Sequence, residues 1–197
     1  APFVLETRAY VATVGSDLDD ARQRWRELYA TDPVSSYIAC LWTARISLWL
    51  GDGDAAAEDN ARYWAAAAHE GIAVPSHDAV NAGVQALRGE REAAVAAYRD
   101  ALARLREFKV PIDEVFTTIE MIDVLGPSEP LVAEAIAAAR AIIARTGAGP
   151  IGALLDRAIA AANARPASPR RTNPEPARAA AVAGAPAAPA SEEQAAS

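Results

Sequence analysis

The sequence predicts an all-α protein built from stacked helical hairpins. Apolar residues make up 52% of the 197-residue chain, and alanine, the strongest helix former, accounts for 51 residues. Valine and isoleucine are scattered and do not form the alternating runs that indicate β-strands. Glycine and proline recur at a regular interval, and a fixed period of about 20 to 50 residues is typical of stacked repeats. The composition therefore predicts the helices, and the period predicts their arrangement.

Four glycines mark the predicted corners of the hairpins: Gly15, Gly51, Gly89 and Gly126, which lie 36, 38 and 37 residues apart. A residue without a Cβ turns the chain tightly at little steric cost, so glycine commonly follows the end of a helix. Inside a helix the same residue costs about 1 kcal/mol against alanine. The stretch LRGEREAAVAAYRDAL therefore predicts two antiparallel helices that meet at Gly89, rather than one long helix.

Prolines and polar side chains mark where the helices begin. Proline near a helix start is expected, because its fixed φ suits the first turn and its missing N–H is not needed there. The prolines that open the segments are Pro33, Pro75, Pro111 and Pro150. The expected capping residues and early-turn acids are Ser16, Asp19, Asp52, Asp54 and Ser128. Each unit is thus a helix of about a dozen residues, a corner and a longer second helix.

Apolar stripes indicate how these helices pack. In the third unit one face of the second helix carries Ala94, Ala97, Tyr98, Ala101, Leu102, Leu105 and Phe108. Segment 150–163 repeats the stripe without a partner helix, so we expect it to cap the stack. Residues 165–197 hold six of the thirteen prolines and no aromatic residue, which predicts a disordered tail. The predicted domains are a helical repeat domain, 1–164, and this Ala/Pro-rich tail, 165–197.

Charge and cysteine content limit the partners and the cellular compartment that the sequence predicts. A formal net charge of −7 disfavours direct binding to a nucleic acid backbone. The single Cys40 and the absence of a signal-peptide pattern favour a cytoplasmic protein. No apolar run approaches the roughly 18 residues that a membrane span needs. Because the chain starts without methionine and enters a helical pattern almost at once, we expect a fragment of a longer protein.

The third unit resembles a tetratricopeptide repeat. The resemblance is carried by Gly89, Glu90, Ala94, Tyr98, Ala101 and Leu102, with a glycine at the corner and small residues at helix contacts. It is looser elsewhere: the units are longer than the family's usual 34 residues, and Asn81 and Gln85 stand where a bulky residue is usual. The resemblance implies a right-handed α-solenoid of about four helical hairpins plus a capping helix.

A wider and more diffuse resemblance covers residues 85–162. This segment is similar in style to the C-terminal helical repeats of large bacterial signalling proteins, including nucleotide cyclases and LuxR-type regulators. That resemblance implies a regulatory region that follows an ATPase or cyclase domain. The chain itself has no phosphate-binding loop, cyclase signature or helix-turn-helix pattern.

No set of residues predicts catalysis, a metal site or a cofactor. The acidic run GDGDAAAEDN at 51–60 lacks the glycine and closing glutamate of a calcium loop, and helix capping is the simpler interpretation. His69 and His77 lie on either side of a predicted break, whereas zinc ligands come in close pairs. Cys40 lies among apolar residues, where a thiol packs as a small hydrophobe. We therefore expect a chain without enzymatic activity and without a cofactor.

The repeat register predicts a concave wall made by the first helices of the units. Counting back from the corner glycines places on it Ile38, Leu41, Arg45, Leu48, Trp49, Asp113, Phe116, Glu120 and Asp123. Such a wall, apolar and basic at one end and acidic at the other, suits a peptide that carries basic residues. The simpler alternative is that the acids form only a solvated face, and that the tryptophans are core residues.

Two functions from different classes follow from this wall. The first is a scaffold that binds a protein segment or an adjacent domain of a longer chain. The second is a sensory module, in which a pocket lined by Trp42 and Trp49 takes a small effector and regulates an upstream enzyme domain. An enzyme would need a convergent acid, base or nucleophile set, which the sequence does not offer.

Overall fold

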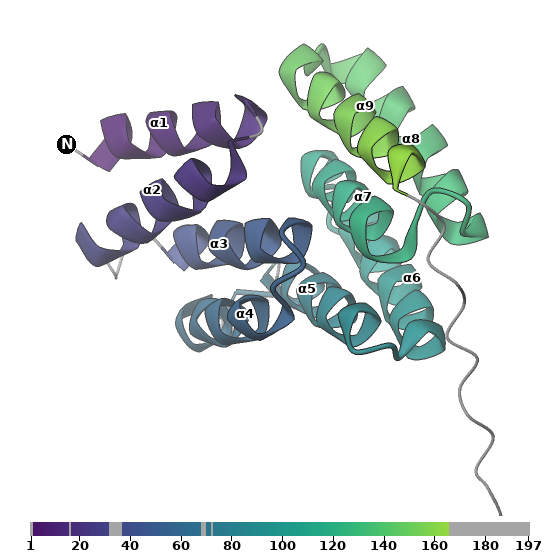
Figure 1. Cartoon of the computed structure of the whole chain (residues 1–197), viewed down its shortest axis with the longest axis horizontal. Coiled ribbons are helices and arrows are strands. Elements are labelled where there is room, and N and C mark those ends of the chain that lie inside the picture. The colour runs from purple at the N-terminus through teal and green to yellow at the C-terminus, as the bar shows by residue number, and fades with distance from the viewer. Residues whose placement is uncertain (1, 16, 32–36, 68–69, 72, 166–197) are drawn as a thin grey trace, which may run out of the picture. The chain divides into compact units, whose positions relative to one another are not determined.

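The computed structural model describes residues 2–15, 17–31, 37–67, 70–71 and 73–165, and nearly all of them are helical. This part of the chain contains nine helices and no strand, so the predicted all-α class is confirmed (Figure 1). The helices are α1 (Pro2–Gly15), α2 (Leu18–Thr31), α3 (Tyr37–Trp49), α4 (Gly53–Ala67), α5 (Ala73–Leu87), α6 (Arg91–Glu107), α7 (Pro111–Leu125), α8 (Pro130–Thr146) and α9 (Gly149–Ala164).

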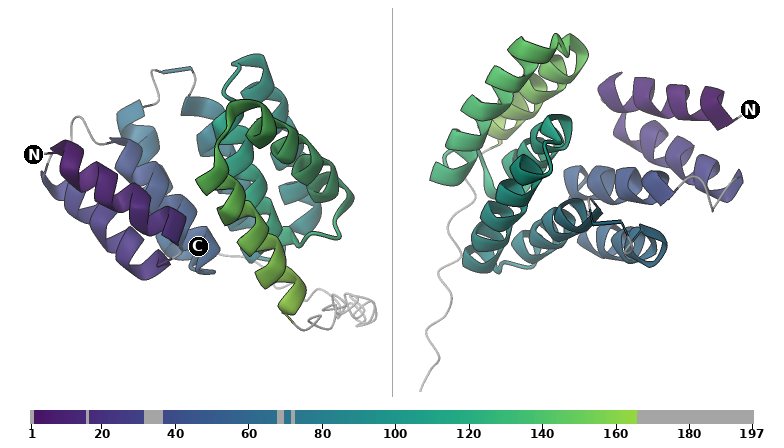
Figure 2. Two further views of the ribbon diagram at one scale, coloured as in Figure 1. Left: turned by 90° about the horizontal axis from the view of Figure 1, so that it is seen from above. Right: turned by 180° about the vertical axis from the view of Figure 1, so that it is seen from behind.

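Consecutive helices pair as hairpins, and the predicted corners lie between them. Gly51, Gly89 and Gly126 have φ angles of 76°, 87° and 86°, the left-handed region that glycine enters without a Cβ clash. Gly15 ends α1, three residues before α2 begins. The pairs are α1 with α2, α3 with α4, α5 with α6 and α7 with α8, and α9 follows the last pair (Figure 2). The corner predictions are therefore confirmed.

The helix starts agree with the predictions in part. Asp52 caps α4, because its Oδ1 accepts a hydrogen bond of 3.2 Å from the Ala55 amide. Pro111 begins α7, and Pro150 is the second residue of α9. The prediction for Ser128 is wrong, since α8 begins at Pro130 and its N-cap is Glu129, which makes no side-chain cap. Ser16, Pro33 and His69 lie outside the described residues.

The apolar stripes form a main core cluster and a second, smaller cluster among α3, α4 and α5. On α6 the predicted stripe is buried at Ala94, Tyr98, Ala101, Leu102 and Leu105. Ala97 is half-buried, and Phe108 is 44% exposed because it follows the last turn of the helix. Capping helix α9 buries Leu154 and Leu155 against this core, as its own stripe predicts. The predicted disordered tail lies, apart from Arg165, outside the described residues.

The hairpins also contact one another beyond their immediate neighbours. Alternate helices pack together, α3 with α5, α5 with α7 and α7 with α9, as in a stack of repeats. In addition α3 contacts α7 directly, and α1 contacts α9. These two contacts join segments that are far apart in the sequence. The contact between α3 and α7 joins the two helices that carry the predicted wall, so it determines which residues of that wall are exposed to solvent.

Candidate functional site

The two helices of the predicted wall meet face to face. The ring of Trp42 on α3 packs edge-on against Phe116 on α7, with centroids 4.6 Å apart. Beside them Arg45 Nε lies 2.7 Å from Glu120 Oε1, and Arg45 Nη1 lies 3.1 Å from Asp113 Oδ1. The guanidinium carbon is 5.6 Å from the centroids of both rings, within cation–π range. Charged and aromatic groups therefore occupy the space between the helices.

Burial dominates the electrostatics of this cluster. The side chains of Arg45 and Glu120 are 1% and 0% exposed. Burial raises the pKa of Glu120 to about 7, with Arg45 opposing the rise and Asp113 adding to it. For Arg45 burial lowers the pKa, but Glu120 and Asp113 outweigh that effect and the net shift is upward. The arginine is thus the permanent charge of the pair, and the glutamate is the group that titrates.

The expected open wall is therefore wrong for most of the residues assigned to it. Most of its members are buried, namely Leu41, Arg45, Leu48, Trp49, Phe116 and Glu120. Ile38, Asp113 and Asp123 are half-buried. Leu41 and Leu48 belong to a second core cluster among α3, α4 and α5, away from α7. The predicted residues do lie on the first helices of their hairpins. However, α7 packs against α3 and the rest of α3 packs against α4 and α5, so most of these side chains contact other residues of the chain rather than solvent.

A small cleft of about 180 Å³ remains beside this interface, and it includes two predicted residues, Trp49 and Asp123. Its other walls come from α2, α7 and α9: Leu18, Ile119, Leu154, Arg157, Ala158, Ala161 and Arg165. The Trp49 indole N–H is buried and has no hydrogen-bond partner among the described residues. Asp123 Oδ1 lies 2.9 Å from Arg165 Nη2, and burial raises the Asp123 pKa to about 6 against the influence of Arg165.

A larger cleft of about 470 Å³ lies between α6, α7 and α8, and the sequence reasoning missed it. Its floor is aliphatic and its rim carries most of its charge. The lining residues are Leu105, Arg106, Lys109, Val110, Pro111, Glu114, Ala138, Ala141, Ile142 and Arg145. They come from the end of α6, the start of α7 and the second half of α8. Periodicity within single helices does not reveal a site assembled from three of them.

Lys109 at the rim of this cleft has an unusual backbone. Its φ of 57° is the one left-handed angle of a non-glycine residue in the described part of the chain. The hydrogen bonds around it repeat those at Gly51 and Gly89: the corner amide bonds the carbonyl three residues earlier, and the next amide bonds the carbonyl five residues earlier. Lys109 thus stands where the other corners have glycine. The sequence signal was the only lysine of the chain, two residues before a proline.

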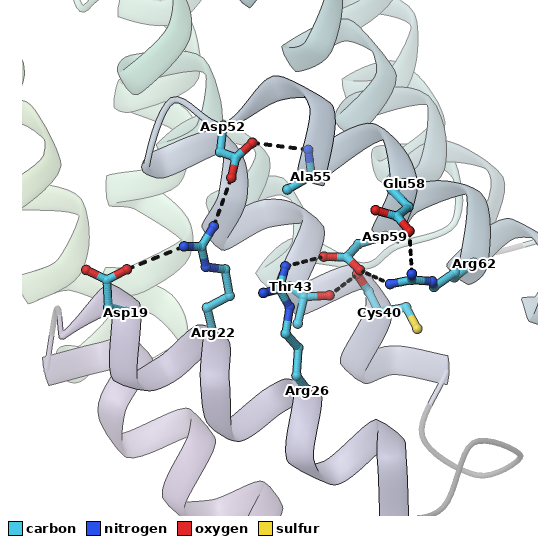
Figure 3. A network of polar contacts seen from close by, with 10 residues as sticks. All are labelled: Asp19, Arg22, Arg26, Cys40, Thr43, Asp52, Ala55, Glu58, Asp59 and Arg62. Carbon is cyan, nitrogen blue, oxygen red and sulfur yellow. Dashed lines mark hydrogen bonds and ion pairs between the residues drawn. The ribbon is translucent and has the colours of Figure 1, made fainter.

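Several polar residues outside these clefts have structural partners. Asp59 on α4 is 4% exposed and lies 2.8 Å from Arg62 Nη1 and 3.5 Å from Arg26 Nη2 of α2, which joins two hairpins (Figure 3). Nearby, Cys40 is buried in the second core cluster, which confirms its packing role, and burial raises the pKa of its thiol to about 11. His77 stacks on Trp64 with centroids 4.4 Å apart. In the described ranges no group of three or more His, Cys, Asp and Glu residues could hold a metal ion.

Comparisons with known proteins found no match, either among family models, among curated proteins or among solved structures. Over the described ranges, no helix is long and apolar enough to cross a membrane. The resemblance to tetratricopeptide repeats therefore stays a prediction from the sequence.

Proposed function

We propose that this chain is a non-catalytic helical-repeat scaffold that binds a protein segment, or an adjacent domain of a longer chain, in the cleft between α6, α7 and α8. The observation that carries the proposal is the aliphatic floor of that cleft, with Leu105 and Ile142 at its base and charged side chains at its rim. Concave sites that are mostly apolar, with a few polar groups at the edge, are typical of binding sites.

The other hollows of the described residues support this choice by contrast. One hollow of about 540 Å³ lies along the surface of α2 and is lined almost wholly by polar and charged side chains. Another of about 350 Å³ lies between α1 and α2, where Arg24 and Asp20 are already paired at 2.6 Å. The wall between α3 and α7 is filled by side chains of the chain itself. Of these sites among the described residues, the α6–α8 cleft is the one that combines a buried aliphatic floor with unpaired cationic side chains.

The wider role that we propose is regulatory. The similarity in style of residues 85–162 to the repeats of bacterial cyclases and LuxR-type regulators supports a cytoplasmic signalling protein with an upstream ATPase or cyclase domain. In such a protein the scaffold would hold a partner or the adjacent domain, and the chemistry would lie elsewhere.

A selection from a displayed library of random peptides tests the scaffold proposal. The full chain should enrich a shared peptide motif, and Ala141→Arg should abolish binding because its side chain fills the cleft. The matched control is Ala144→Arg, three residues along the same helix, exposed and absent from the cleft lining. A motif that binds both variants equally would place the site elsewhere, and the absence of any motif would contradict the proposal.

A second candidate function is sensing of a small effector in the cleft beside Trp49. The observation that favours it is the buried indole N–H of Trp49, which has no partner and lines a hollow of about 180 Å³. An acceptor group on a small molecule would satisfy that donor. A metabolite screen read by tryptophan fluorescence tests it, and titration calorimetry of any hit compares the native chain with Trp49→Phe, which has a smaller aromatic ring and no N–H. A saturable fluorescence change in the native chain, together with calorimetric binding that is lost in Trp49→Phe, would favour sensing over scaffolding.

A further inference from the structure

The rim of the α6–α8 cleft carries an excess of positive charge in an acidic protein. Three of its residues are cationic, Arg106, Lys109 and Arg145, and one is acidic, Glu114. The rim therefore has a net charge of 3 − 1 = +2, whereas the whole chain has −7. Such a local reversal of sign is a feature of surfaces that select partners by charge.

The acid at the rim is already neutralised by its neighbour. Glu114 Oε1 lies 2.6 Å from both Nε and Nη2 of Arg106, and the Glu114 side chain is only 7% exposed. Lys109 and Arg145 are both exposed, and within the described ranges neither forms an ion pair with a carboxylate. The charge that the cleft offers to a partner is thus the ammonium of Lys109 and the guanidinium of Arg145.

A structural role explains only some of these cations. Arg106 and Arg145 lie in the last turns of α6 and α8, where a positive charge complements the helix dipole. Lys109 lies beyond the end of α6, in a left-handed conformation that costs about 1–2 kcal/mol for a residue with a Cβ. Glycine occupies the same position at Gly51 and Gly89 without that cost. A strained residue at the edge of a cleft is an observation that points to function rather than to stability.

The floor of the cleft indicates that the partner also carries apolar groups. Leu105 and Ile142 are buried beneath it, and Val110, Pro111 and Ala138 complete an aliphatic surface. A volume of about 470 Å³ admits a few aliphatic side chains. Such a floor gives no affinity for a purely polar anion. Two free cations are also far fewer than the phosphate contacts of a typical nucleic acid site.

We infer that the partner segment of this cleft is acidic and amphipathic: a peptide whose aliphatic side chains enter the floor while its carboxylates pair with Lys109 and Arg145. This inference rests on the proposed scaffold function and adds the chemistry of its partner. It differs from the expectation drawn from the predicted wall, because the acids of that wall are paired within the chain and the free charge of the α6–α8 cleft is positive.

A matched set of labelled peptides tests the inference by fluorescence anisotropy with the full chain. The peptides are amphipathic helices of about 15 residues with the same leucines and with Glu, Gln or Lys at the polar positions. We expect the Glu peptide to bind at least about tenfold tighter than the Lys peptide, and added salt to weaken the Glu peptide alone. Ala141→Arg should abolish its binding, and Ala144→Arg should leave it unchanged.

Charge-neutralising variants separate the contribution of the rim charges to peptide binding from that of the apolar floor. Lys109→Gln and Arg145→Gln should each weaken the Glu peptide by roughly threefold to fivefold and leave the Gln peptide unaffected. Lys109→Gln keeps a side chain in the same backbone conformation, and circular dichroism verifies that each variant is folded. Equal effects of these variants on both peptides would overturn the assignment of the charge to the rim.

The remaining outcomes distinguish the two proposals. If the Gln or Lys peptide binds best and Ala141→Arg abolishes that binding, the acidic partner is wrong and the scaffold function stands. If no peptide binds and the library yields no motif, both are wrong. Stronger binding to phosphatidylglycerol vesicles than to the Glu peptide, sensitive to Ala141→Arg, would replace the peptide with a membrane surface and overturn the inference.

Discussion

Arg45 and Glu120 show how a pair of charged residues can be part of a core. The repeat register, counted back from the corner glycines, placed both residues on the inner wall, but it did not indicate what covers that wall. Their side chains are 1% and 0% exposed and lie 2.7 Å apart, and Arg45 also lies 3.1 Å from Asp113. Removing one partner of such a pair typically costs about 3–5 kcal/mol, because the other is left buried and uncompensated.

The first prediction concerns the pH dependence of stability. The Glu120 pKa is about 7 in the folded chain, above the ordinary value of 4.5, so folding binds a proton between these values. The stabilisation is fully present below about pH 4.5 and is lost as the pH rises through 7. Urea unfolding of the native chain and Glu120→Gln at several pH values should show a steeper loss in the native chain, up to about 3 kcal/mol. Parallel profiles would contradict the assignment.

The second prediction concerns close packing at Gly83. A Cβ built there would lie 2.5 Å from Leu48 Cδ1 and 2.8 Å from the Tyr98 hydroxyl oxygen. Both neighbours are buried and cannot move aside freely. Gly83→Ala should therefore lower the free energy of unfolding by about 1–3 kcal/mol in a urea titration. The control is Gly149→Ala, which meets no atom within 4 Å and should change stability little.

At the scale of elements, the sequence predicted where helices end better than where they begin. Three of the four corner glycines, Gly51, Gly89 and Gly126, meet one physical requirement, a left-handed φ, so the residue and the turn are closely linked there. A helix start can be capped by any of several residues within a short stretch, and here the N-cap is Glu129 rather than the predicted Ser128. The turn at Lys109 was not predicted, because lysine is not a residue that signals a left-handed corner.

The third prediction exchanges the residues of two equivalent corners. Lys109→Gly should raise the free energy of unfolding by about 0.5–1 kcal/mol, since relief of backbone strain exceeds the entropy cost of glycine. Gly89→Lys, at the same position of the preceding corner, should lower it by about 1 kcal/mol or more. Chemical denaturation measures both. Destabilisation by Lys109→Gly would mean that the lysine side chain supports the fold.

At the scale of the molecule, four rings connect the first hairpins to the fourth. Tyr10 packs against Trp25 at 4.9 Å, Trp25 stacks on Trp42 at 5.5 Å, and Trp42 meets Phe116 at 4.6 Å. The sequence could predict the stack of hairpins but not the direct contact between α3 and α7. Small differences in packing set the rotation from one repeat to the next, and these rotations add up along the array. The wall was therefore expected to be open and proved to be covered.

The fourth prediction tests whether this connection makes folding cooperative. All four tryptophans lie in residues 25–64, so their fluorescence reports on the first two hairpins, whereas far-ultraviolet circular dichroism reports on every helix. In the native chain the two urea transitions should coincide. Phe116→Ala removes the contact with Trp42 and should cost about 3–5 kcal/mol. It should also separate the transitions, and coincident transitions in this variant would contradict the coupling.

The lysine at the α6 corner also has a practical consequence. Because the chain has one lysine, an amine-reactive dye attaches at one side chain and otherwise at the N-terminal amine. A fluorophore introduced in this way sits at the mouth of the α6–α8 hollow without any engineered cysteine. Protection of that amine from acylation would then reveal an occupied site in a mass spectrum, even for a ligand of unknown identity.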